Sequence, residues 1–134
     1  MNAVTAVQAY SFIDNVALVE QATPHQLVTL LMRSANQRLA QALQALDQND
    51  IPAKGEQLSK VLDILNYLSV CVEPQQGGED LSENLLNLYR YMERRILHAN
   101  LHHDAAIIVE VKSLLTELED GWHAINGSDH NVEI

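Results

Sequence analysis

The stretch that most strongly indicates the fold is QGGEDLSENLLNLYRYMERRILHAN, residues 76–100, where apolar side chains return with the period of an α-helix. Acidic residues stand at its beginning and Arg94 and Arg95 near its end, an order of charges that the helix dipole favours. The stretch therefore predicts one amphipathic helix, yet it holds more leucine and tyrosine than a single buried stripe uses. The expected stripe consists of Leu81, Leu85, Leu88, Tyr89, Met92, Ile96 and Ala99.

Three breaks divide the rest of the chain: QNDIP at 48–52, EPQQGG at 73–78 and HANLHHD at 98–104. They separate four segments of roughly twenty residues, each with apolar residues at helical spacing. Short connections between helices of similar length favour antiparallel neighbours. Because the chain is also 47% apolar and poor in aromatic residues, Gly and Pro, we expect an all-α fold, an antiparallel up-down four-helix bundle.

Capping residues indicate where these helices begin and end. Thr23 can cap the first helix, and Gln26, three residues later, completes a capping box. Pro52 suits the opening of the second helix and Asp104 the cap of the fourth, which the Asn126-Gly127 pair is expected to stop.

The chain is expected to have three parts. Residues 1–22 contain apolar side chains but keep no single period, which predicts a segment that docks loosely on the bundle. Residues 23–126 form the bundle itself, and residues 127–134 are expected to be a disordered tail.

The charge of the chain excludes several classes of partner. A net charge of −10 with eight Lys and Arg residues argues against binding to nucleic acid, which needs clustered basic side chains. An acidic surface also repels anionic lipid. No apolar run approaches the roughly 20 residues that span a bilayer, and neither end resembles a signal peptide. We therefore expect a soluble, unprocessed protein without membrane insertion.

Two single residues are predicted to be structural. Cys71 is the sole cysteine, so it cannot form an intrachain disulfide, and its apolar neighbours predict a small buried hydrophobe in a reducing cytoplasm. Trp122 falls on the apolar stripe of the fourth helix, where we expect the ring to pack and its indole N–H to find an acceptor nearby.

Residues with catalytic or metal-binding chemistry do not form a convincing site. His98 and His102 stand four apart, beside His103 and Asp104, a spacing found among metal ligands. The predicted break at 98–104 argues against a common helical face for the two histidines. The sequence has no phosphate loop, HExxH motif or nucleophile elbow, and its carboxylates fall on predicted solvated faces. We therefore expect no enzyme activity, no cofactor and no metal.

The apolar surplus indicates a binding surface. The surplus includes Val109 in the fourth helix. Part of it is ordinary core edge, and the remainder would form grooves that can receive an amphipathic partner helix. Core-edge packing and partner contact both remain open for Tyr67 and Tyr91, and Tyr10 would lie on a cover formed by the N-terminal segment. Helix phase selects as candidate partner-binding residues Tyr10, Ile64, Tyr67, Leu68, Leu86, Tyr91 and Leu97.

The string GGEDLSENLLNLYRYMERRILHAN, residues 77–100, resembles a region of the FliS family of flagellar export chaperones, which reads GGE, a leucine-rich stretch, LYxYM and a closing AN. ATPHQLVTLLMRSANQRLAQAL, residues 22–43, resembles that family's TASPxELVxMLYDGAxxxLxxA, and it departs from it at Met32–Ala35. Tyr10 and Trp122 are similarly placed to a tyrosine and a tryptophan of the family.

This resemblance implies a cytoplasmic four-helix bundle that binds the disordered C-terminal segment of flagellin. Such a chaperone would prevent premature polymerisation and aid delivery to the flagellar type III export apparatus. Export-gate components or flagellar regulators would be further candidate partners, and the chaperone itself would be a monomer or weak homodimer. The alternative is a bundle that serves as an oligomerisation or regulatory module without a flagellin client.

Overall fold

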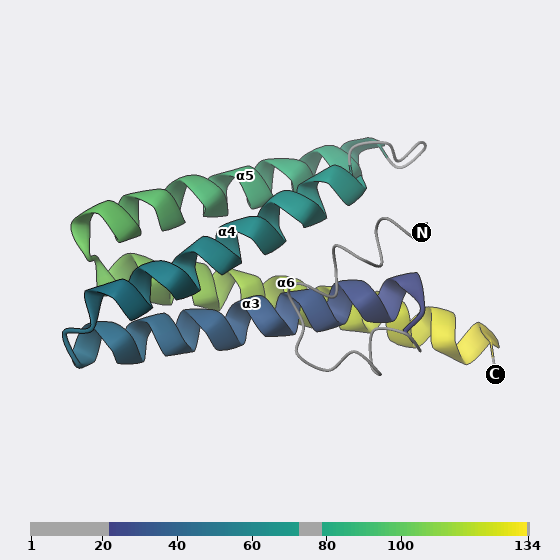
Figure 1. The fold of residues 1–134 in the computed structure, drawn as a ribbon. Helices are drawn as coiled ribbons and strands as arrows, with labels where there is room; N and C mark the ends of the chain where they lie inside the picture. The colour runs from purple at the N-terminus through teal and green to yellow at the C-terminus, as the bar shows by residue number, and fades with distance from the viewer. Residues whose placement is uncertain (1–21, 73–78, 134) are drawn as a thin grey trace.

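In the computed structural model, the backbone is described at residues 22–72 and 79–133, and the side chains at residues 22–72 and 83–124. Each helix in these residues runs back along the one before it, which makes an up-down bundle (Figure 1). Contacts between α3 and α4, α4 and α5, α5 and α6, and α6 and α3 close the ring. The prediction of an all-α four-helix bundle is confirmed. The helices are α3 Pro24–Asp47, α4 Ile51–Val72, α5 Glu79–His102 and α6 Ala105–Glu133.

The predicted capping box is present at the start of α3. The Thr23 hydroxyl accepts from the Gln26 N–H at 3.1 Å, and the Gln26 side-chain oxygen accepts from the Thr23 N–H at 2.9 Å. Together these bonds satisfy two N–H groups that a helix start would otherwise leave without partners. The start of the first helix was therefore predicted correctly.

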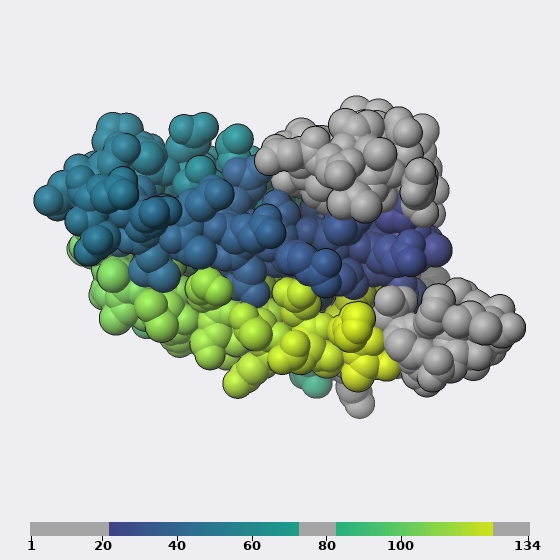
Figure 2. All heavy atoms as spheres, turned by 90° about the horizontal axis from the view of Figure 1, so that it is seen from below, coloured from purple at the N-terminus to yellow at the C-terminus, as the bar shows by residue number. Residues whose placement is uncertain are grey.

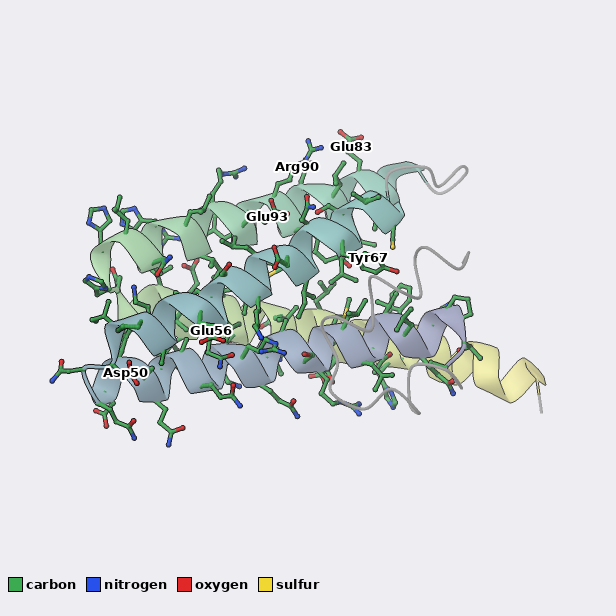
Figure 3. All side chains as sticks on the ribbon, viewed as in Figure 1. Asp50, Glu56, Tyr67, Glu83, Arg90 and Glu93 are labelled. Atoms are coloured by element: carbon green, nitrogen blue, oxygen red, sulfur yellow. The ribbon has the colours of Figure 1, made fainter. Side chains whose placement is uncertain are left out.

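The turn between α3 and α4 depends on two residues. Asn49 has a φ of 58°, a left-handed conformation that asparagine tolerates better than most residues. Asp50 then caps α4, since its carboxylate accepts from the Ala53 N–H at 3.2 Å. Figure 3 shows Asp50 at this end of the bundle.

The turn between α5 and α6 is shorter than the predicted break at 98–104. α5 continues through His102, and the reversal is made by His103 with a φ of 55°. The Asp104 N–H then donates to the Ala99 carbonyl at 3.0 Å, and the Asp104 carboxylate caps α6 at the Ile107 N–H. Most of the predicted break is helical, because one left-handed residue followed by a cap is enough to end one helix and start the next.

The predicted stop at Asn126-Gly127 is wrong, since α6 continues to Glu133. Glycine inside a helix costs only about 1 kcal/mol relative to alanine, so it permits a helix to continue. Disorder of residues 127–134 in solution stays a prediction. The expected N-terminal docking segment, with Tyr10, lies outside the described residues.

α3 and α6 lie side by side along one face of the molecule (Figure 2). Trp122 joins α6 to the start of α3, because its indole N–H donates to the His25 carbonyl at 3.1 Å and its ring stacks on the His25 imidazole. The side chain is half-buried against the core, as expected. None of the helices in the described residues has the length of continuous apolar sequence that a membrane span requires.

A charged residue that sequence reasoning passed over lies inside the bundle. Lys54 is 2% exposed, and its ammonium donates to the Asn100 backbone oxygen at 2.9 Å and to the Asn100 side-chain oxygen at 2.6 Å. Burial lowers the pKa of Lys54 from its ordinary value. The contact joins the first turn of α4 to the last turns of α5.

Candidate partner-binding surface

The structure divides the predicted partner-binding residues between the core and the surface. The three on α4 all belong to the hydrophobic core: Ile64 and Leu68 are fully buried and Tyr67 is 7% exposed. These side chains contribute first to the packing of α4 against its neighbours. A partner would therefore contact the surface residues that lie over these three side chains, and these side chains would support that surface from within the core.

The predicted residues on α5 are more accessible. Leu86 and Tyr91 are half-buried, while Leu97 is 57% exposed. Tyr10 lies outside the described residues. The candidate set therefore supplies one large apolar side chain that faces solvent directly, Leu97, and two half-buried ones, of which Tyr91 packs against the core.

Two further exposed apolar side chains near this end of the bundle were left out of the sequence prediction. Leu101 follows it by four positions on the same face of α5 and is 74% exposed. Val109 is more than half exposed in the first turns of α6, just beyond the short turn. Leu101 was missed because it was assigned to a break, and Val109 was counted in the surplus but not chosen. Leu97 and Leu101, which lie one turn apart near the end of α5, are here called the α5 apolar pair.

A polar network fastens α5 to α6. The Tyr91 hydroxyl donates to one Glu110 carboxylate oxygen at 2.6 Å, and Arg95 donates to the other at 3.0 Å. These bonds favour the ionised carboxylate and lower the pKa of Glu110, while the bond to Glu110 raises the pKa of Tyr91. The network holds the half-buried Tyr91 ring in a fixed position at the border between the helices.

Basic side chains also gather on α5, although the chain as a whole is acidic. Arg90 projects outward from α5, as does Glu83 nearer its start (Figure 3). The Arg94 guanidinium lies 6.0 Å from the centre of the Tyr91 ring, within the range of a cation–π contact. The later part of α5 therefore offers aliphatic and cationic groups together, a combination that suits a partner with apolar anchors and acidic residues.

The two histidines at the end of α5 occupy the common face that the sequence prediction denied them. His98 and His102 both lie within the helix, and their ring centroids are 4.4 Å apart. That prediction was wrong because it followed from the misplaced break. Within residues 22–72 and 83–124, no group of three or more His, Cys, Asp and Glu side chains is arranged to hold a metal ion.

Cys71 is half-buried near the end of α4, where the sequence predicted a buried side chain. Burial raises the pKa of the Cys71 thiol, and a hydrogen bond with Tyr67 offsets part of that rise. Since the thiolate is the reactive form, we expect the folded protein to react with iodoacetamide roughly tenfold more slowly than the urea-unfolded chain near neutral pH. Mass spectrometry of timed samples measures both rates, and equal rates would contradict the inferred environment of the thiol.

Comparison with known proteins identifies the family of the chain. The model of a family described as flagellar protein FliS matches residues 6–129. The flagellar secretion chaperone FliS of Salmonella typhimurium is 40% identical over 127 residues, which cover 94% of this chain and 93% of that protein.

Two further relatives extend this similarity. The flagellar secretion chaperone FliSB of Pseudomonas aeruginosa is 38% identical, with 94% of this chain and 99% of that protein covered. The flagellar secretion chaperone FliS of Vibrio cholerae is 35% identical, with 95% and 93% covered. Because the family match and these relatives span nearly the whole chain, which also folds as the expected bundle, the protein belongs to the FliS family of flagellar proteins.

Proposed function

We propose that this protein is a cytoplasmic export chaperone that binds the disordered C-terminal segment of flagellin. Binding would prevent premature polymerisation and aid delivery of flagellin to the flagellar type III export apparatus. Family membership supports the chaperone role, since the similar proteins of Salmonella and Vibrio are named flagellar secretion chaperones. The structural observation that carries the proposal is the α5 apolar pair, Leu97 and Leu101, because large aliphatic side chains exposed together mark sites of protein interaction.

We expect the client to bind as one or more amphipathic helices. A disordered segment that orders on binding can lay apolar anchors, spaced as i, i+3, i+4 and i+7, along the surface of a helical bundle. Leu97 and Leu101 would meet these anchors directly, and Leu86 and Tyr91 would extend the contact along α5. Ile64, Tyr67 and Leu68 would support the surface from the core, with Tyr10 on an N-terminal cover. Export-gate components or flagellar regulators remain candidates for additional partners.

The proposal is tested by isothermal titration with a peptide that covers roughly the last forty residues of flagellin from the same cell. We expect one-to-one binding with a markedly negative change in heat capacity, because apolar surface is buried as the client orders. If no heat is detected at several temperatures while the protein is folded, the flagellin proposal is wrong. Concentration-dependent dimerisation in sedimentation experiments would then favour an oligomerisation module.

The role of the exposed leucine is tested by Leu97→Ala. We expect this variant to bind the flagellin peptide about tenfold more weakly, since it removes an apolar anchor, without a change in unfolding midpoint. Val70→Ala is the matched control, because Val70 is equally exposed, at 57%, on a different helix. Equal affinity of the Leu97 variant and the control would show that the client uses another face.

A further inference from the structure

His98 and His102 form a pair of accessible imidazoles on the surface of the bundle. They stand four positions apart, so in the last turns of α5 one side chain lies above the other. The ring centroids are 4.4 Å apart and the ring planes are tilted by 45°. Both side chains are exposed, which leaves the ring nitrogens within reach of ions in solvent.

Nothing in the described part of the chain competes for these nitrogens. Among residues 22–72 and 83–124, neither imidazole makes a hydrogen bond or an ion pair with another side chain. The nearby Asp104 carboxylate already accepts from the Ile107 N–H as a helix cap. The His98 and His102 rings can therefore turn toward a common ligand without breaking a polar contact of the fold.

We propose that His98 and His102 form a two-imidazole site for a divalent transition-metal ion of borderline softness, such as Ni²⁺ or Zn²⁺. Imidazole nitrogen is a preferred ligand of these ions, and two histidines four apart on one helical face are an arrangement that binds zinc. Mg²⁺ and Ca²⁺ require oxygen ligands, so the site discriminates against them.

The remaining coordination positions of such an ion would be filled by water or by donor groups of a bound partner. An ion held by both rings would also bridge one turn of α5, from His98 to the last residue of the helix. Leu101 lies within that turn, so metal binding would stiffen the part of α5 that carries this exposed leucine. The metal site itself does not depend on the flagellin proposal.

The experiment is isothermal titration of the full, untagged chain with NiCl₂ and, separately, with ZnCl₂ at about pH 7.5. We expect one ion per chain, and a loss of affinity of roughly tenfold or more in each of His98→Asn and His102→Asn. His103→Asn and His123→Asn are the matched controls, since they remove exposed imidazoles outside the pair, and each is expected to bind like the unaltered chain.

A second measurement uses folding as the readout. Saturating Ni²⁺ should raise the thermal unfolding midpoint of the unaltered chain and leave that of the double variant unchanged, because an ion bound to the folded state stabilises it. Unchanged affinity in either single variant of the pair, or an equal loss in His103→Asn, would overturn the assignment.

Discussion

Replacing Ile64 by alanine is expected to lower the free energy of unfolding by about 2–5 kcal/mol, because the side chain is fully buried and its removal leaves a cavity. A domain of this size is typically stable by about 5–15 kcal/mol, so the loss is a large fraction of the total. Leu68→Ala should behave similarly, since Leu68 lies in the same core. Urea unfolding followed by circular dichroism measures both effects.

Leu101→Ala is the matched control, because it makes the same truncation on a side chain that is 74% exposed. We expect it to change stability by less than about 0.5 kcal/mol. This comparison distinguishes buried residues, which stabilise the fold, from exposed residues, which are available to bind a client. If Ile64→Ala kept full stability and lost flagellin binding, the residue would belong to the binding surface itself.

The second large effect is expected at the buried lysine. Asn100→Ala removes the closest acceptor of the Lys54 ammonium and leaves part of a buried charge without a partner. We expect a loss of about 2–3 kcal/mol, which is typical of a hydrogen bond to a charged group. Asn100→Asp is the control, because a carboxylate there can accept the same bond and should preserve more of the stability. If both variants lost the same amount of stability, the side-chain acceptor at position 100 would not be the source of the stabilisation.

The buried position of Lys54 also predicts how the free energy of unfolding depends on pH. Burial lowers the pKa of Lys54, so between that lowered value and its ordinary 10.5 the unfolded chain binds more protons than the folded chain. The charged form of Lys54 therefore lowers the free energy of unfolding, and this destabilisation decreases as pH rises through this window. Lys54→Met should remove that part of the pH dependence.

The pH prediction is measured as the difference in unfolding free energy between the unaltered chain and Lys54→Met, at about pH 8 and about pH 10. Taking the difference removes the contribution of Tyr89, whose pKa is raised by burial and which acts in the opposite direction at high pH. A difference that stays constant with pH would contradict a lowered lysine pKa.

The sequence was most informative where structure is local. The capping box at Thr23 and Gln26 and the cap at Asp104 were found because each involves residues within one turn of the chain. The helix ends were harder, since His103 ends α5 through a backbone conformation that its residue type hardly signals. Leu101 was lost from the candidate surface for that reason.

By itself, the sequence determined the four helical segments, their antiparallel order and the resemblance to a family, because periodicity, caps and motifs each depend on residues that are close together in the chain. Only the tertiary structure decided that Tyr67 packs in the core while Leu97 faces solvent, although both flank an apolar stripe. It also decided that Lys54 lies inside the bundle against Asn100. The physical reason is that one residue of phase turns a helix by about 100°, and the packing partners fix that phase.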